Sequence, residues 1–157
     1  MTFASSNPPD PGSHLVSNRA FKVEPIEAPI HRVAEIETVI TSLGREPRGG
    51  LVVMPDIYMT AHRTQIISLA IRNNVPEVYQ FSLFAREGGL LSYGPDPVDI
   101  FRRSATYIDR ILRGERPAEL PVQVPVKFQM AVNVKTAKAL GLTIPQSILL
   151  RADEVIE

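Results

Sequence analysis

The sequence predicts an α/β protein whose largely parallel sheet is flanked by helices. Apolar runs of strand length alternate along the chain with stretches whose apolar residues recur at helical spacing. Repeated strand and helix units of this length are typical of a parallel sheet covered by helices, and the chain contains no internal repeat. The 157 residues suit one domain, large enough to bury about two-thirds of its unfolded surface.

The first part of the chain predicts two strands and two helices in alternation. Phe21–Ile26 is the first predicted strand, and the helix after it ends at Gly44. Leu51–Met54 is a continuous apolar run, typical of a strand buried on both faces. A second helix is predicted from Thr60 to Asn73, where a pair of asparagines stops it. The apolar positions are Val33, Ile36, Val39, Ile40 and Leu43 in the first helix and Ile66, Ile67, Leu69, Ala70 and Ile71 in the second.

Two more short strands lead to the longest predicted helix. The strands are Val78–Phe81 and Leu90–Tyr93, separated by a loop that contains Gly88 and Gly89. The helix runs from Pro97 to Arg113, because proline suits a first helical turn. Its charges complement the helix dipole, with Asp96 and Asp99 at the start and Arg110 and Arg113 at the end, and Gly114 closes it. Its predicted buried face consists of Phe101, Ser104, Ala105, Ile108, Ile111 and Leu112.

The carboxyl-terminal part predicts a strand, a short helix and a tail. Apolar and other residues alternate strictly from Val126 to Val132, which indicates a strand. Asn133 is a good N-cap for the helix that follows, and Gly141 ends that helix.

The amino-terminal segment, residues 1–20, predicts a disordered tail. It is rich in Pro, Ser, Asn and Gly and has little to bury, so it does not offset its own ordering entropy. It also lacks the basic start and the apolar run of a signal peptide, so the chain as written is expected to be cytoplasmic. A displaced start codon or a frameshift, and an ordinary flexible terminus, are both open as explanations.

Composition excludes several classes of function. Seventeen basic residues balance 17 acidic ones, so no net field holds a nucleic acid, and no nucleic-acid partner is predicted. The absence of cysteine excludes thiolate nucleophiles, thiolate zinc sites and disulfides, and leaves the redox compartment open. No apolar stretch approaches the length that spans a bilayer, which predicts a soluble chain.

Three stretches closely resemble a family of ABC-transporter substrate-binding proteins with the type I periplasmic-binding-protein fold. They read LVVMPDIYMTAHRTQIISLAIRNNVPEVYQF from Leu51, GGLLSYGPDPVDIFRRSATYIDRILRG from Gly88 and VNVKTAKALGLTIPQSILLRADEVI from Val132. The resemblance covers roughly Lys22 to the end. It implies that residues 21–157 are a partial, truncated substrate-binding domain, comprising the second lobe, the last hinge crossing, the final helix of the first lobe and the returning strand.

The resemblance also implies a function. Members of the family capture a small organic solute, amino-acid-like in some relatives, and pass it to an ABC permease at the membrane, which places them in the periplasm. Two lobes close on the solute, no bond is made or broken, and no cofactor is needed, so we expect a binding protein and not an enzyme. A cytosolic small-molecule sensory domain and an inactive gene fragment are the alternatives.

The missing first lobe has two expected consequences. Half a cleft is expected to bind its solute weakly or not at all. The helix at residues 97–113 would pack on that lobe in the family fold, so the chain alone is expected to expose an apolar helix face, which predicts a homodimer, poor solubility or partial unfolding.

Three residues lead the ligand-binding candidates. Asp56 follows the apolar strand Leu51–Met54, and open α/β sheets place ligand sites at such strand ends. Its carboxylate can accept a hydrogen bond from a ligand amino group, although Pro55 and Asp56 also make a good turn. Tyr93 and Gly94 lie on the crossing segment that the resemblance implies, where a tyrosine makes a useful wall for a small organic ligand. A hinge that only sets backbone angles is the alternative for Gly94.

Three further candidates rank below these. His62 lies near a helix start and can face the ligand, although such a histidine is more often solvated. Tyr79 and Phe81 are aromatic residues at the end of the next strand, and core packing is the more ordinary role for at least one of them.

The sequence contains no pattern for metal or enzyme chemistry. It has no HExxH motif, no histidine pair at helical separation and no acidic calcium loop, so no metal is predicted. The nucleophile elbow, the phosphate loop and GxGxxG are absent, and GREPRGG (Gly44 to Gly50) has the wrong spacing for a phosphate site. No catalytic residue is predicted.

Overall fold

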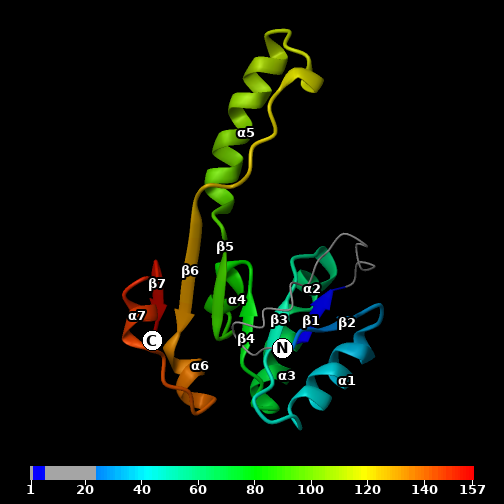
Figure 1. The fold of residues 1–157 in the computed structure, drawn as a ribbon, viewed down its shortest axis with the longest axis vertical. Helices are drawn as coiled ribbons and strands as arrows, with labels where there is room; N and C mark the ends of the chain where they lie inside the picture. Colours follow the sequence, from blue (N-terminus) through cyan, green and yellow to red (C-terminus); the bar gives the residue numbers. More distant parts are fainter. Residues whose placement is uncertain (1, 6–23) are drawn as a thin grey trace.

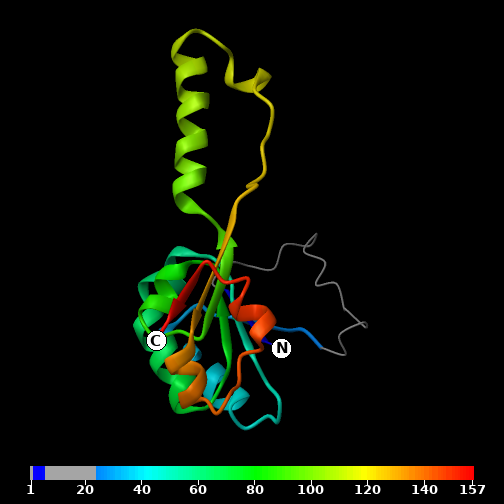
Figure 2. The same cartoon turned by 90° about the vertical axis from the view of Figure 1, so that its left-hand side faces the viewer.

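The computed structural model describes residues 2–5 and 24–157, and these form an α/β body from which a long arm rises (Figures 1 and 2). Within the described residues, seven strands form one sheet in the order β2-β1-β3-β4-β5-β6-β7. All neighbouring strands are parallel except β5 and β6, which are antiparallel. The predicted α/β class with a mostly parallel sheet is therefore confirmed. The strands are β1 Thr2–Ser5, β2 Ile26–Pro29, β3 Leu51–Val53, β4 Glu77–Tyr79, β5 Leu91–Pro95, β6 Phe128–Asn133 and β7 Glu154–Ile156.

The first two strands differ from the prediction. The strand expected at Phe21–Ile26 runs instead from Ile26 to Pro29, and residues 21–23 lie outside the described residues. Thr2–Ser5, expected to be part of a disordered tail, forms β1 between β2 and β3. The residues of β1 show no strand pattern in the sequence. They form a strand because β2 and β3, on its two sides, provide partners for its backbone N–H and C=O groups. Residues 1 and 6–23 of the chain lie outside the described part.

Seven α-helices and one short 3-10 turn connect the described strands. Helix α1 (Val33–Leu43) confirms its prediction, and Gly44 is its C-cap. The single helix expected from Thr60 to Asn73 is wrong, because the chain forms two helices that join at His62. The helices after the first are α2 Ile57–Ala61, α3 Arg63–Arg72, α4 Ser82–Arg86, α5 Pro97–Leu112, α6 Val134–Ala139 and α7 Gln146–Leu149, and the 3-10 turn is Pro117–Glu119.

One face of the sheet carries the core. Helices α1 and α3 and the ring of Phe84 in α4 pack on the inward residues of β3 and β4, which alternate with half-buried residues on the opposite face. The buried apolar cluster comprises Ile30, Ile36, Ile40, Leu43, Leu51, Val53, Met59, Ile66, Ile67, Leu69, Ala70, Val75, Tyr79 and Phe84.

The carboxyl-terminal strands are tied to the body by specific polar contacts. Asn133 caps α6 as predicted, since its side chain accepts from the Thr136 N–H at 2.9 Å, and its amide donates to the Ala85 carbonyl at 3.0 Å. The Thr136 hydroxyl donates to the Gly88 carbonyl at 2.7 Å. Helix α7 and strand β7 were not predicted, because elements of four and three residues are too short to show a helical or a strand periodicity.

Helix α5 and its return segment form the arm. The helix begins at Pro97 as predicted and ends at Leu112, and Gly114 follows it with a left-handed φ of 101°. None of its side chains is buried, so the face predicted to pack on another surface is exposed in this chain. The described residues contain no helix long and apolar enough to cross a membrane.

Candidate ligand-binding site

Five residues of interest lie at or just after the ends of β3, β4 and β5 and at the start of β6. Strands β5 and β6 connect the body to the arm at this end (Figure 1). Strands β3, β4 and β5 are parallel, so their carboxyl ends meet at one edge of the sheet. Strand β6 is antiparallel to β5 and therefore enters the sheet at this same edge. We call this region the carboxyl edge, and it consists of Asp56, Phe81, Tyr93, Gly94 and Phe128.

Asp56 is positioned by the helix that it begins. Its Oδ1 accepts from the backbone N–H of Met59 at 2.7 Å, and its own carbonyl accepts from the Thr60 hydroxyl at 2.8 Å. The residue is half-buried, and the neighbouring Ile57 is almost fully exposed. The turn that the sequence predicted and a ligand-facing carboxylate are compatible, because the cap hydrogen bond holds the carboxyl group in one orientation at the edge.

Tyr93 forms an exposed aromatic pair with Phe128. Their ring centroids lie 5.6 Å apart with an interplanar angle of 22°, and the side chains are 53% and 44% exposed. The antiparallel register, in which Tyr93 faces Met130 and Pro95 faces Phe128, brings the rings together diagonally. The sequence showed Phe128 only as one member of an alternating strand and did not predict its place beside Tyr93. Two stacked rings open on one side are a ready surface for a planar or apolar ligand group.

Gly94 permits a close approach between β4 and β5. A Cβ atom at this position would lie 2.3 Å from the carbonyl oxygen of Gln80 and 2.5 Å from its Cγ. Glycine is thus required here by space rather than by an unusual φ. Two buried oxygens nearby, Gln80 Oε1 just after β4 and Ser92 Oγ on β5, have no hydrogen-bond partner among the described residues. Buried oxygens without a hydrogen-bond partner are uncommon in proteins, so these two oxygens make the surroundings of Gly94 a region of interest.

His62 lies at the junction of α2 and α3. Its Nδ1 lies 2.9 Å from the Tyr58 carbonyl, which can only accept, so Nδ1 carries the proton. The imidazole also packs against the Tyr58 ring, with centroids 4.3 Å apart. The side chain is half-buried and holds the bend between the helices.

Tyr79 and Phe81 differ in their burial. The Tyr79 ring is buried in the core and stacks on Phe84 at 4.5 Å, and burial raises the pKa of its hydroxyl well above the ordinary range. Phe81 is half-buried, packs against the same core and begins α4 at the carboxyl edge. Core packing, the alternative role that the sequence left open for at least one of them, is the role that Tyr79 has in this structure.

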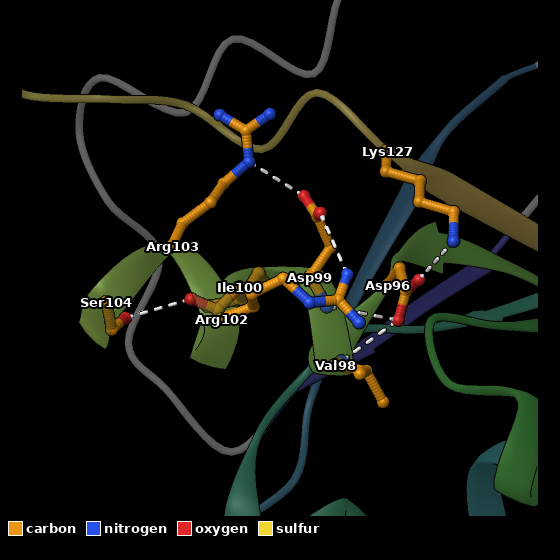
Figure 3. A network of polar contacts seen from close by, with 8 residues as sticks. All are labelled: Asp96, Val98, Asp99, Ile100, Arg102, Arg103, Ser104 and Lys127. Atoms are coloured by element: carbon orange, nitrogen blue, oxygen red, sulfur yellow. Dashed lines mark hydrogen bonds and ion pairs between the residues drawn. The ribbon is translucent and has the colours of Figure 1, made fainter. Parts of the chain in front are cut away.

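A network of charged side chains fixes the base of the arm (Figure 3). Asp96 caps α5 by accepting from the Val98 N–H at 2.9 Å, and its other oxygen pairs with Lys127 Nζ at 2.9 Å. The Asp96 N–H donates to the Lys127 carbonyl at 2.9 Å. The hydrogen bond from Lys127 lowers the pKa of Asp96, and the same contact raises the pKa of Lys127. Asp99 extends the network through Arg103 at 2.8 Å.

Glu77 is a buried carboxyl group that the sequence did not single out. It begins β4, at the opposite end of the strand from the carboxyl edge. Its Oε1 accepts from the Leu90 N–H at 3.1 Å, and its Oε2 has no hydrogen-bond partner among the described residues. Burial raises the pKa of Glu77 to about 7. Its position removes it from the candidate site.

A polar pocket of about 160 Å³ lies between helix α4, strand β6 and the start of β7. One wall is held by Arg86, whose guanidinium binds both carboxylate oxygens of Glu154 at 2.8 to 3.0 Å. The Met130 N–H donates to Asp153 at 2.8 Å on the other wall. No cluster of three or more His, Asp or Glu residues in the described part of the chain is arranged to hold a metal ion. The pocket is lined by Ser82, Arg86, Gln129, Met130, Ala131, Asp153 and Glu154.

The fold is an α/β sheet, and its candidate ligand-binding site lies at the carboxyl ends of the parallel strands. The family model described as ABC transporter substrate binding protein matches residues 14–156. The chain therefore belongs to the ABC transporter substrate-binding protein family, which confirms the predicted resemblance. A search among curated proteins finds no match to this sequence.

Three solved structures resemble the chain. A conserved domain protein from Vibrio cholerae has a TM-score of 0.78 and 23% identity over 87% of this chain and 46% of its own. An ABC domain in complex with L-Trp from Streptococcus pneumoniae has a TM-score of 0.77 and 25% identity over 88% of this chain and 48% of its own. A ligand-free, open substrate-binding protein with adhesive properties from Clostridium difficile has a TM-score of 0.64 and 21% identity over 99% of this chain and 54% of its own. The chain thus spans about half the length of the structures that it matches.

Proposed function

We propose that the chain supplies one wall of the solute-binding cleft of an ABC importer, and that the carboxyl edge is this wall. The observation that carries the proposal is the exposed Tyr93 and Phe128 pair at the edge where Asp56 is held by its helix cap. The proposed ligand-binding residues are Asp56, Tyr93, Gly94, His62 and Phe81, with Phe128 added from the structure. Tyr79 supports this set from the core below.

The proposed solute is small, organic and amino-acid-like. The Asp56 carboxylate provides an acceptor for an ammonium group, and the stacked rings of Tyr93 and Phe128 provide a surface for an apolar or planar side chain. The L-Trp complex of the Streptococcus pneumoniae relative supports this class of solute. Binding involves no covalent chemistry, in keeping with the generally non-enzymatic character of the family.

Capture is proposed to work by closure of two lobes. The half of the matched fold that this chain does not span would supply the opposite wall, and the closed state would be selected because only it contacts the solute from both sides. Strands β5 and β6 would be the crossing segments, and the Asp96 and Lys127 pair would fix the direction in which they leave the sheet. Family membership supports a periplasmic location and a membrane permease as the partner that receives the solute.

Ligand-detected NMR tests the proposal directly, because saturation transfer reports weak binding to a single wall. The probes are the twenty common L-amino acids, each mixed with the purified chain. We expect signals for aromatic amino acids, with a Kd on the order of 1 mM. Asp56→Asn keeps a capping residue but removes the charge, so it should weaken binding severalfold, and Tyr93→Ala should abolish the signal.

Tyr107→Ala is the matched control, because Tyr107 lies on the arm and its hydroxyl bonds only to the Pro121 carbonyl among the contacts described. It should leave the amino-acid signals unchanged. No saturation transfer from any of the twenty amino acids, or signals that survive Tyr93→Ala at full strength, would refute the proposal.

A further inference from the structure

The polar pocket between α4, β6 and β7 lies on the opposite face of the sheet from the Tyr93 and Phe128 rings. Residues that face each other in the antiparallel register of β5 and β6 share a face, and neighbours along one strand alternate. Tyr93 and Phe128 therefore lie on one face, and Gln129 and Ala131, which line the pocket, lie on the other. Helix α4 packs over this second face. The proposed function makes no use of the pocket.

The charged side chains of the pocket keep some hydrogen-bonding groups free. Arg86 uses Nε and Nη2 to bind the carboxylate of Glu154 at 2.8 to 3.0 Å, so the two N–H groups of Nη1 have no partner among the described residues. Asp153 accepts from the Met130 N–H through Oδ2 at 2.8 Å, and its Oδ1 is free of contacts with the described residues. The pocket thus offers a cationic donor and an anionic acceptor.

Polar side chains without partners gather on the same face of the sheet. The Ser82 hydroxyl and the Gln129 amide line the pocket and form no hydrogen bond with the described residues. Ser92 lies on this face of β5, is 1% exposed, and its Oγ has no partner. Gln80 covers Gly94 on this face, and its Oε1 is buried without a partner. Because buried polar atoms are normally hydrogen-bonded, this concentration of unsatisfied groups beside one cavity indicates that the cavity accepts a polar ligand.

The volume of the pocket restricts the size of that ligand. About 160 Å³ corresponds to the share of about five water molecules in the liquid. A ligand of about five to seven non-hydrogen atoms fits this space, whereas sites for drug-sized ligands begin at about 300 Å³. Aromatic amino acids, whose binding tests the proposed function, are too large for this pocket.

We propose that the pocket is a second ligand site, which binds a small zwitterionic amino acid of the size of glycine or serine. The ligand carboxylate binds the Nη1 donors of Arg86, and the ligand ammonium group binds Oδ1 of Asp153. The Ser82 hydroxyl and the Gln129 amide supply the remaining hydrogen bonds, since each can donate and accept.

The charges of the lining favour a zwitterion over a simple ion. Arg86 carries one positive charge, and Asp153 and Glu154 carry two negative charges. An anion alone would face the unneutralised Asp153 carboxylate, and a cation alone would leave the free N–H groups of Arg86 without an acceptor. A molecule with both charged groups satisfies both sides of the pocket at once.

A titration of the ¹⁵N-labelled 157-residue chain with glycine, at constant ionic strength, tests the proposal. Acetate and methylammonium are the comparison probes, because each carries only one of the two charged groups of glycine. We expect saturable shift changes at the amides of Ser82, Arg86, Ala131 and Glu154, with a Kd for glycine on the order of 10 mM. Each single-charge probe should bind at least about tenfold more weakly. L-tryptophan should leave these amides unchanged.

Two variants test the assigned contacts. Asp153→Asn keeps an oxygen for the Met130 N–H but removes the charge, so it should weaken glycine binding about tenfold. Ser92→Ala should keep the wild-type melting temperature, because its hydroxyl has no partner to lose, and should weaken glycine binding severalfold. Asp109→Asn is the matched control, because it removes a carboxylate from an exposed ion pair on the arm, and it should leave the titration unchanged.

Three results would overturn the proposal. The first is the absence of saturable shift changes at the pocket amides up to about 100 mM glycine, which would show that the pocket holds only water. The second is binding of acetate or methylammonium as tight as that of glycine. The third is a glycine titration that Asp153→Asn leaves unchanged. Tyr93→Ala should not alter the glycine titration, so this proposal and the proposed function succeed or fail separately.

Discussion

Replacing Glu77 by glutamine should remove the pH dependence that this residue gives to the stability of the fold. Glu77 is buried, and burial raises its pKa from 4.5 to about 7. The folded state therefore binds a proton that the unfolded state releases between these two pH values. The contribution of Glu77 to stability is highest below pH 4.5, falls as the pH rises towards 7, and is level above that value.

The size of this effect follows from the two pKa values. Each unit of difference between the folded and unfolded states corresponds to about 1.4 kcal/mol. A rise from 4.5 to about 7 therefore costs the folded state about 3 kcal/mol once Glu77 is ionised. Glutamine avoids that cost and keeps an oxygen for the Leu90 N–H, but its amide adds a buried donor at about 1 kcal/mol.

The variant should thus be about 2 kcal/mol more stable than the wild type at about pH 8 and about 1 kcal/mol less stable at about pH 4. Urea unfolding followed by circular dichroism, repeated at intervals between these two pH values, measures both differences. Glu37→Gln on the exposed face of α1 is the matched control and should leave the curve unchanged. Plots of stability against pH that stay parallel for wild type and variant across this range would refute the assignment of the slope to Glu77.

Two other predictions concern the strands beside the site. Gly94→Ala should destabilise the fold by about 1 to 3 kcal/mol in the same urea experiment, because its Cβ would lie 2.3 Å from the Gln80 carbonyl oxygen. Gly50→Ala should be tolerated, because the atom nearest to its Cβ would be the Pro76 carbonyl oxygen at 3.6 Å. Equal stabilities of the two variants would contradict this account. Lys127→Met should raise the pKa of Asp96 and leave the body folded, and an unchanged Asp96 titration by carboxyl-detected NMR would show that Lys127 is not the cause.

Local signals explain why some elements were predictable. Helix α5 was predicted to within one residue because residues at its own ends signal where it starts and stops. Pro97 follows an acidic N-cap at the start, and Gly114 adopts a left-handed backbone after the end. The same holds for the cap of α6 by Asn133. The break between α2 and α3 has no such signal, because His62 bends the chain through a hydrogen bond to a carbonyl four residues earlier.

Long-range pairing explains what the sequence did not predict. Asp56 could be singled out because the apolar pattern shows the end of the strand before it. Tyr93 could be singled out because the family resemblance implies a crossing segment at its position. Phe128 could not, because its place beside Tyr93 depends on antiparallel pairing between strands that are far apart along the chain. Strand β1 is a similar case, since only its neighbours in the sheet make Thr2–Ser5 a strand.

Protein-detected NMR with L-tryptophan is the most direct test of the central claim, that the carboxyl edge is a solute-binding surface. The backbone amides of the ¹⁵N-labelled chain would be assigned and followed during the titration. We expect the largest shift changes at Asp56, Tyr93, Gly94 and Phe128, with small changes at the opposite end of β4 near Glu77. Changes spread evenly over the surface, or confined to the arm, would contradict the account.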